Sequence, residues 1–394
     1  MGTWSTMYYG PVKEIIGTGS IAAIGEMAEE KGVKKVLLVT DEGVMKAGHP
    51  QKASEYLNKK GIASVIYEKV QTDPKDTMVR EALKLLKEEG CDGVLAVGGG
   101  SSMDVAKAVS AMCTNPGDIM EYTRHTKNRR KWTAKRIPLF LAVTTSGTGS
   151  EQSPFAVITN TEIGRKCNVV NYDFHPDGII LDAELTATLD QRWTVSCGFD
   201  ALAHLCDGIT VKDEICAPNH FHNIITYEGI RLCYNSLRQC VYVPNNLKAR
   251  EDLLIASDFG GMVLSAGTGA THGLGNILSK YYHIPHGETV GILLPYVMEY
   301  NLPACPDRFA KMAESMGADI SGMTDMEAGR KAVQKVKELI AETELPLLKE
   351  YMKQEELTDA FIEESIDNTC NFTNARDITV KAARMIFENA LTGI

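Results

Sequence analysis

The first half of the chain alternates short apolar runs with stretches of helical periodicity. The runs contain few polar side chains, as expected for strands buried on both faces, and they cover residues 35–40, 63–67, 93–97 and 138–143. Between them, residues 79–89 have apolar side chains at the spacing of one helical face. Buried strands separated by helix-length connections are typical of βαβ units, so this half predicts an α/β domain with a parallel, Rossmann-like sheet.

The alternation ends near Leu185, and the second half predicts helices only. Helical periodicity without long β-branched runs covers residues 223–241, 247–266, 307–316, 327–343 and 375–391. We therefore expect an α/β domain over residues 1–187 and an all-helical domain over residues 188–394. The length of 394 residues agrees with two domains, because single cores rarely grow beyond about 250–300 residues.

Composition and charge narrow the class of function. Forty-one basic and 51 acidic side chains give a net charge of -10, which repels phosphate backbones and anionic lipid. We therefore expect no nucleic-acid partner and no membrane partner. No apolar run is long enough to cross a bilayer, and the N-terminus lacks the pattern of a signal peptide, so we expect a cytoplasmic protein. The 10 cysteines form no C-x-x-C pair, which favours buried, reduced thiols over zinc ligands or disulfides.

Two glycine-rich loops follow predicted strands. Gly98, Gly99 and Gly100 lead from the strand at residues 93–97 into a helix that Ser101 or Ser102 is expected to cap. Residues 144–151 follow the strand at residues 138–143 in the same way. Glycines let a backbone approach a pyrophosphate, and the free N–H groups of a helix start attract its charge. Two such loops predict a ligand at the carboxyl edge of the sheet, although each loop alone also fits a simple tight turn.

A competing dinucleotide signature lies near the N-terminus. Residues 17–22 match G-x-G-x-x-A and are followed by a helical stretch, a strand and Asp41. The preceding residues 12–16 carry two charges, whereas a central parallel strand is continuously apolar. We therefore interpret residues 17–22 as a turn and helix start. Asp41 can still accept hydrogen bonds from a ribose 2'-hydroxyl and repel a 2'-phosphate, and its alternative role is a helix N-cap.

The helical half contains a candidate metal site. Asp200 and His204 are four residues apart and so share one face of a helix. His272 and His286 each lie beside glycine or proline. Three imidazoles and one carboxylate suit Fe(II) or Zn(II) better than Mg(II) or Ca(II). Each histidine by itself also fits a hydrogen-bonded position in the core or in a turn.

Taken together, these motifs resemble the iron-dependent, or group III, alcohol dehydrogenases over essentially the whole chain. The resemblance implies a dehydroquinate synthase-like architecture with an NAD(P)-binding α/β domain and a helical domain. It implies that Asp200, His204, His272 and His286 hold the metal. It also implies a row of residues along the cofactor, which are Gly99, Gly100, Ser101, Thr144, Thr145, Thr148 and Lys166. On the same basis, the turn at residues 17–22 is not the phosphate loop.

The chain departs from the family pattern at three positions. Family members often have Pro-Asn-Pro where this chain has Thr72, Asp73 and Pro74, which bears on cofactor contacts. The acid after the first metal helix is usually Glu and is Asp207 here. Many members have a second histidine four residues after the third metal ligand, and this position is Asn276. An amide can hold a water or a hydroxyl group but cannot titrate near neutral pH.

These features predict a metal-dependent, NAD(H)-linked alcohol dehydrogenase or aldehyde reductase. Its substrate would be a small primary alcohol, a diol or a short aldehyde, including an anionic one. Fe(II), or alternatively Zn(II), would act as a Lewis acid, and no side chain need be a nucleophile. The alternatives are a zinc polyol dehydrogenase similar to glycerol dehydrogenase, a zinc enzyme similar to dehydroquinate synthase, and a metal-free nucleotide-binding protein. The expected assembly is a homodimer or a higher homo-oligomer.

Overall fold

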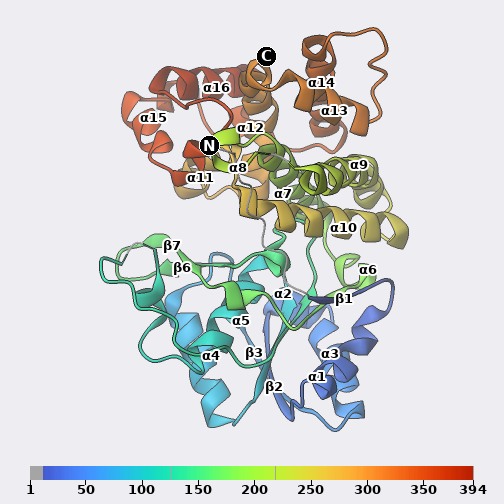
Figure 1. The fold of residues 1–394 in the computed structure, drawn as a ribbon, viewed down its shortest axis with the longest axis vertical. Coiled ribbons are helices and arrows are strands. Elements are labelled where there is room, and N and C mark those ends of the chain that lie inside the picture. Colours follow the sequence, from blue (N-terminus) through green and yellow to red (C-terminus); the bar gives the residue numbers. More distant parts are fainter. Residues whose placement is uncertain (1–11, 125, 218, 394) are drawn as a thin grey trace. The chain divides into compact units, whose positions relative to one another are not determined.

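The chain forms two compact units, which Figure 1 shows as a computed structural model. The structure describes residues 12–124, 126–217 and 219–393. Within these ranges, one unit comprises residues 12–145 and 149–188, and the other comprises residues 146–148 and 189–393. The second unit thus includes Ser146–Thr148, a segment that the expected two-domain division assigns to the α/β domain.

The first unit is built on a parallel sheet of six strands. The strands are β1 (Lys13–Ile16), β2 (Lys35–Asp41), β3 (Ala63–Val70), β4 (Gly93–Gly98), β5 (Leu139–Val143) and β8 (Gly178–Leu181). Their order is β1-β8-β5-β4-β2-β3, and every neighbouring pair is parallel. The four strands expected from the sequence are confirmed. Strand β1 lies at an edge, which explains how it tolerates the charged residues Lys13 and Glu14.

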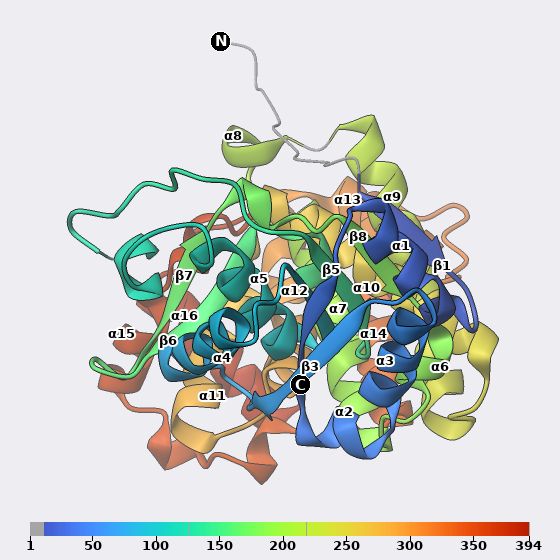
Figure 2. The same ribbon diagram turned by 90° about the horizontal axis from the view of Figure 1, so that it is seen from below.

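Helices cover both faces of this sheet, as in doubly wound folds (Figure 2). On one side are α1 (Ile24–Glu30) and α3 (His49–Lys59), and on the other are α4 (Asp76–Glu88) and α5 (Gly100–Met112). The remaining short helices are η1 (Ser20–Ala23), α2 (Glu42–Lys46), η2 (Ile119–Tyr122), η3 (Ser150–Gln152), η4 (Tyr172–Phe174) and α6 (Ala183–Thr186). A separate antiparallel hairpin joins β6 (Phe155–Asn160) to β7 (Arg165–Val170). The sequence analysis expected neither this hairpin nor β8.

The second unit contains helices and no strand in the part that the structure describes. The longer helices are α7 (Gln191–Ile209), α9 (His220–Tyr242), α10 (Leu247–Val263), α11 (Ala270–Tyr282), α12 (His286–Asn301), α13 (Pro306–Ser315), α14 (Asp325–Glu342), α15 (Asp359–Ile366) and α16 (Val380–Thr392). The shorter ones are α8 (Asp213–Cys216), η5 (Leu264–Ala266), η6 (Leu302–Ala304), η7 (Leu348–Glu350), η8 (Gln354–Glu356) and η9 (Thr369–Phe372). All five expected helices are confirmed, but α16 begins five residues later than expected, at the N-cap Thr379.

Helix α7 forms the centre of this unit. It packs against α9, α10 and α12, and nearly all of its residues after the first turn are buried. Glycines allow the close approach of its neighbours, because a Cβ on Gly291 of α12 would lie 2.8 Å from Cβ of Phe199. A helix that is buried all round places its polar side chains in the interior of the unit. Asp200 and His204 are therefore internal groups.

In the glycine turn at residues 17–22, a side chain accepts hydrogen bonds from two backbone N–H groups. Gly19 N donates to Asp182 Oδ1 at 3.0 Å, and Ile21 N donates to Asp182 Oδ2 at 3.1 Å. The same carboxylate caps α6 by accepting from Glu184 N. A phosphate at residues 17–22 would have to displace this buried carboxylate. The interpretation of residues 17–22 as a turn and helix start is confirmed, because they continue into η1 and α1.

No described helix is by itself long and apolar enough to span a membrane. Residues 247–266 and 270–282 meet the length and composition criteria only as a pair, and the two segments are bent by 104°.

We predict that Asp182→Ala destabilises the protein without weakening coenzyme binding. Three backbone N–H groups would lose their charged acceptor, which should lower the free energy of unfolding by about 2–4 kcal/mol. Denaturant unfolding measures the loss, and a fluorescence titration measures the affinity for NADH. Asp182→Asn is the matched control and should lose less stability, because it retains an acceptor oxygen. A variant of normal stability that binds NADH weakly would identify residues 17–22 as the phosphate loop.

Candidate metal and coenzyme sites

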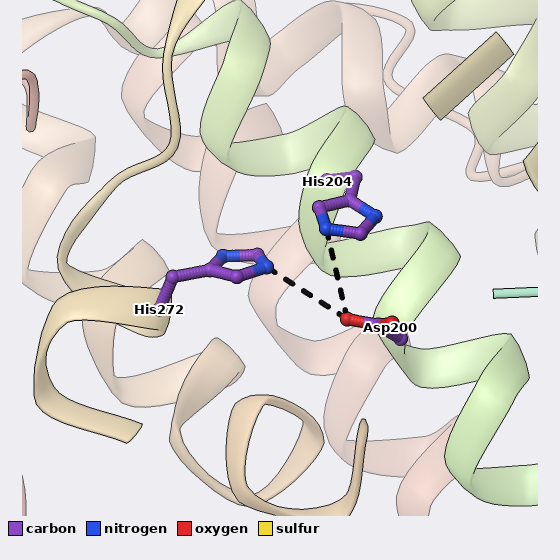
Figure 3. A group of neighbouring side chains, drawn as sticks. All are labelled: Asp200, His204 and His272. Atoms are coloured by element: carbon purple, nitrogen blue, oxygen red, sulfur yellow. Dashed lines mark ion pairs between the residues drawn. The ribbon is translucent and has the colours of Figure 1, made fainter. Parts of the chain in front are cut away.

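Four side chains from three helices of the helical unit converge on one point. Asp200 and His204 come from α7 and His272 from α11, and their potential ligand atoms lie within 4.8 Å of one another (Figure 3). His286 is the first residue of α12. The Nε2 atoms of His204, His272 and His286 are each 3.7 Å from Oδ1 of Asp200. The structure thus brings together the four side chains expected to be metal ligands.

The distances and the donor types suit a divalent metal ion. Tetrahedral coordination with bonds of about 2.0–2.2 Å separates ligand atoms by about 3.3–3.6 Å, close to the distances seen here. Oδ1 of Asp200 and Nε2 of His272 are buried and have no hydrogen-bond partner among the described residues. Buried polar atoms are normally paired, so these two atoms point to a missing partner. Nitrogen and oxygen donors in this mixture fit Fe(II) or Zn(II).

Hydrogen bonds to Nδ1 fix the tautomers of two histidines. His204 Nδ1 donates to the carbonyl oxygen of Gly147 at 3.2 Å, and His272 Nδ1 donates to Oδ2 of Asp207 at 2.8 Å. Carbonyl and carboxylate oxygens only accept, so Nδ1 carries the proton on both rings. When these rings are neutral, the lone pair is therefore on Nε2, which faces Asp200, in the arrangement that metal-binding histidines usually have.

Close backbone packing holds the segment around Gly147 against α7. A Cβ on Gly147 would lie 2.8 Å from both Cα and the carbonyl oxygen of Cys197. A larger residue would therefore move the carbonyl oxygen that accepts from His204. This packing explains why Ser146–Thr148 groups with the helical unit.

The start of α12 is attached to α7 by a buried acid. Glu288 is 1% exposed and pairs with Arg192, with Nε–Oε1 and Nη2–Oε2 distances of 2.5 and 3.1 Å. The Tyr351 hydroxyl donates to Oε2 of Glu288 at 2.8 Å. A Cβ on Gly287 would lie 2.0 Å from the carbonyl oxygen of Ser196, so α12 approaches α7 closely next to His286.

The electrostatics of the cluster favour an ionised acid. Burial alone would raise the pKa of Asp200, but the neighbouring imidazoles lower it well below its usual range. Burial lowers the pKa of His204. For His272 burial acts in the same direction, but the neighbouring carboxylates of Asp200 and Asp207 outweigh it and raise the pKa. The metal-free cluster thus retains a proton that a metal ion would replace.

The α/β unit presents the first glycine-rich loop at the carboxyl edge of its sheet. Gly98 ends β4, Gly99 is the N-cap of α5, and Gly100 is its first residue. The expectation that Ser101 or Ser102 caps this helix is wrong, because the helix begins before both serines and Gly99 has no side chain to bond its N–H groups. The N-terminus of α5 therefore retains donors that a phosphate can use.

Thr144 and Thr145 lie beside this loop. Gly98 pairs with Val143 in the sheet, and Thr144 N donates to the carbonyl oxygen of Gly98. A Cβ on Gly99 would lie 2.8 Å from Cγ2 of Thr145. The structure thus brings together the two strand ends that the sequence analysis singled out. Thr148 belongs instead to the segment that groups with the helical unit.

Asp41 and Lys166 have partners within the α/β unit. Asp41 is the N-cap of α2 and its Oδ1 accepts from Val44 N at 3.0 Å, so the N-cap alternative is correct. Its Oδ2 lies 3.9 Å from the position of a Cβ on Gly98, at the same strand edge. Lys166 is in β7, and its Nζ lies 2.5 Å from Oδ1 of Asp73. One of the three departures from the family pattern therefore contacts a residue expected to bind the cofactor.

The sequence analysis did not identify the role of Lys107, a residue of α5. Its buried ammonium lies within hydrogen-bond distance of the carbonyl oxygens of Ser150, Ser153 and Phe155. Burial lowers the pKa of Lys107 to about 8, against the attraction of Asp104. Lys107 thereby attaches α5 to the end of the second glycine-rich loop. The only sequence signal for this role was a lysine on the apolar face of a helix.

Comparisons with known proteins agree with this geometry. The model of the family described as iron-containing alcohol dehydrogenase matches residues 11–183. The model described as Fe-containing alcohol dehydrogenase family, C-terminal, matches residues 194–391.

Individual relatives agree with both family models. The chain is 35% identical to a 1,3-propanediol dehydrogenase of Klebsiella pneumoniae over 342 residues, 86% of each protein. It is 28% identical to an NAD-dependent methanol dehydrogenase of Bacillus methanolicus over 98% of this chain and 100% of that protein. A solved 1,3-propanediol oxidoreductase matches 98% of this chain and 100% of its own length with a TM-score of 0.92 and 32% identity. The chain therefore belongs to the iron-containing alcohol dehydrogenase family.

Proposed function

We propose that this protein interconverts a small primary alcohol or diol with its aldehyde, using NAD(H) and a divalent metal ion. The observation that carries the proposal is the convergence of three imidazole nitrogens, each 3.7 Å from one buried carboxylate oxygen. Relatives named as 1,3-propanediol dehydrogenase and NAD-dependent methanol dehydrogenase support the substrate class. A short anionic aldehyde remains an alternative substrate.

The metal would be held by Asp200, His204, His272 and His286. A bound Fe(II) ion, or Zn(II) as the alternative, would supply a Lewis acid that polarises a substrate oxygen. The carboxylate would supply a negative charge, and the three neutral imidazoles would supply nitrogen donors. The ring of His286 is 39% exposed while the Asp200 side chain is 6% exposed, which makes His286 the accessible member of the set. The complete ligand set argues against a metal-free nucleotide-binding protein.

The coenzyme would bind to the α/β unit, which we assign to residues 1–187, with the metal-binding domain at residues 188–394. The uncapped start of α5 would hold the pyrophosphate through Gly99, Gly100 and Ser101. Thr144 and Thr145 lie on the neighbouring strand end. The family resemblance adds Thr148 and Lys166 to this set, and Gly98 belongs to it as the first glycine of the loop.

No side chain needs to act as a nucleophile in this reaction. NAD(H), when bound, supplies the hydride acceptor or donor at nicotinamide C4. Asn276 lies one helical turn after His272 on α11, where its amide can orient a hydroxyl group or a water but cannot carry a proton. Proton exchange would therefore use water, a ribose hydroxyl or a threonine hydroxyl. The cytoplasmic location and the homo-oligomeric state stay predictions.

A metal-removal experiment tests the proposed function. The purified protein is stripped with a chelator, and separate samples are reconstituted with Fe(II) and Zn(II). NADH oxidation is then followed with short unbranched aldehydes, and NAD⁺ reduction with 1,3-propanediol and primary alcohols. Stripping should abolish turnover and Fe(II) should restore it, while restoration by Zn(II) alone would favour the polyol dehydrogenase alternative. Undiminished turnover by the stripped protein would contradict a metal-dependent reaction.

His286→Ala should remove the metal while leaving the protein folded. The ion would lie within a large prefolded unit rather than nucleate its folding, so the far-UV circular dichroism spectrum should not change. Elemental analysis should fall from about one ion per chain to near zero, with a parallel loss of activity. His220→Ala is the matched control, because His220 is an exposed histidine of the same unit. If the variant retains the wild-type metal content, His286 is not a ligand.

Asp41 should make the protein prefer NAD(H) over NADP(H). Repulsion of a 2'-phosphate and the loss of ribose hydrogen bonds should disfavour NADP(H) relative to NAD(H) by about 1.5–3 kcal/mol. This corresponds to a difference of roughly tenfold or more in kcat/KM. Asp41→Gly should narrow this preference. Asp41→Asn should narrow it as well while retaining the hydrogen bond to Val44 N, which separates the charge from the N-cap. Glu42→Gln removes a neighbouring exposed charge and should change nothing. Equal use of both coenzymes by the wild type would refute the assignment.

A further inference from the structure

The carboxylate of Asp207 accepts three hydrogen bonds from the start of α11. Oδ2 accepts from His272 Nδ1 at 2.8 Å and from Gly269 N at 2.9 Å. Oδ1 accepts from the Thr271 hydroxyl at 2.7 Å. Asp207 is 3% exposed and lies near the end of α7, three residues after His204. This one side chain therefore links the helix that carries two proposed metal ligands to the helix that carries a third.

Helix α11 cannot cap its own N-terminus. Its N-cap is Gly269, which has no side chain, so the first N–H groups of the helix need acceptors from elsewhere. Asp207 accepts from Gly269 N, and Oδ1 of Asn374 accepts from Ala270 N at 3.0 Å. A Cβ on Gly269 would lie 2.9 Å from Oδ1 of Asp207, so only glycine lets the backbone reach the carboxylate without a shift. The position of the first turn of α11 is thus set by a residue of α7.

His272 lies in this first turn, as the third residue of the helix. The Asp207 carboxylate therefore acts on it twice, by fixing where the helix starts and by holding Nδ1–H in a direct hydrogen bond. The second contact leaves Nε2 as the only lone pair of the ring and makes it a stronger donor. His204 has a neutral carbonyl oxygen in the equivalent place, that of Gly147. Of these two rings, only that of His272 has a charged partner at Nδ1.

We propose that Asp207 is a positioning residue that presets His272 for the metal and determines how tightly the metal is held. The proposal rests on the metal site of the proposed function but does not depend on the substrate. Loss of an acid in this position typically weakens metal binding by about 10- to 100-fold. Affinity for the coenzyme should not change, because no described contact of Asp207 involves the α/β unit.

Metal binding to the stripped full-length protein tests this inference directly. Zn(II) affinity is measured by competition with a chromophoric chelator, and the absorption bands of bound Co(II) report the geometry of the site. Asp207→Asn keeps the size of the side chain but removes its charge, and it should weaken Zn(II) binding by about 10- to 100-fold. Asp207→Glu keeps the carboxylate and should recover most of this loss. Affinity for NADH should equal that of the wild type in both variants.

Asp190→Asn is the matched control, because Asp190 caps the other end of the same helix and should leave Zn(II) affinity unchanged. Thr271→Val removes only the bond to Oδ1 and should weaken Zn(II) by a smaller factor of about 2–5. If Asp207→Asn does not fold, Thr271→Val serves as the test of the proposal instead. The proposal would be overturned if a folded Asp207→Asn variant binds Zn(II) as tightly as the wild type. If Asp207→Asn does not fold, wild-type Zn(II) affinity in Thr271→Val would overturn it. An equal loss in Asp190→Asn would do the same.

The same measurements separate this proposal from the proposed function. Wild-type protein that binds Zn(II) but turns over no alcohol or aldehyde would refute only the function. Wild-type protein that binds neither Zn(II) nor Co(II) would refute the metal site and Asp207 as its positioning residue.

Discussion

The helical unit depends on the buried carboxylate of Asp200, whose Oδ1 accepts no hydrogen bond from the described residues. Oδ1 of Asp200 faces three imidazole nitrogens inside an apolar core, and no partner among the described residues satisfies it. An unpaired charge in such a place is strongly destabilising unless a cation compensates it. The imidazoles compensate it in the metal-free protein, where His272 retains a proton. A divalent ion held by these four side chains would compensate the same charge.

The glycine-containing turns and helix starts of this protein differ in whether a carboxylate accepts their N–H hydrogen bonds. This difference distinguishes structural sites from candidate ligand sites. Asp182 occupies the N–H groups of the glycine turn before α1, and Asp207 with Asn374 occupies those at the start of α11. At the start of α5 the N-cap is Gly99, which has no side chain to accept hydrogen bonds from the first N–H groups. All three places have the glycines that let a phosphate approach. What differs is whether an anionic side chain already accepts the hydrogen bonds.

Proposed ligands are held by contacts that lie outside the ligand set. His204 depends on a backbone carbonyl from a loop, His272 depends on an acid from another helix, and the start of α12 depends on the pair of Arg192 and Glu288. In the α/β unit, Lys107 similarly holds the end of a loop that follows the sheet. The proposed ligands lie in short sequence motifs, whereas the groups that orient them come from distant parts of the chain.

The sequence by itself determined the elements whose signal is local. Continuous apolar runs identified β2, β4 and β5, because a strand buried on both faces has few polar positions. A shorter run identified β3, which lies at an edge of the sheet and is only partly buried. The four-residue spacing of Asp200 and His204 was enough to place both on one face of a helix. Family resemblance, rather than spacing, joined His272 and His286 to them. Periodicity alone identified α4 in the first unit and five helices in the second.

Tertiary structure decided everything that depends on partners distant in sequence. Strand β1 has charges because it is at an edge, so it lacks the pattern of a central strand. Strand β8 is apolar and buried, but its four residues are too few for a clear signal. The serines after Gly100 were expected to cap α5, but the helix starts earlier, with Gly99 as its N-cap and Gly100 as its first residue. The partner of His204 is a backbone carbonyl, which has no sequence signature. Hydrogen-bond acceptors of this kind are fixed only when helices pack, and for that reason the amino-acid sequence alone could not assign them.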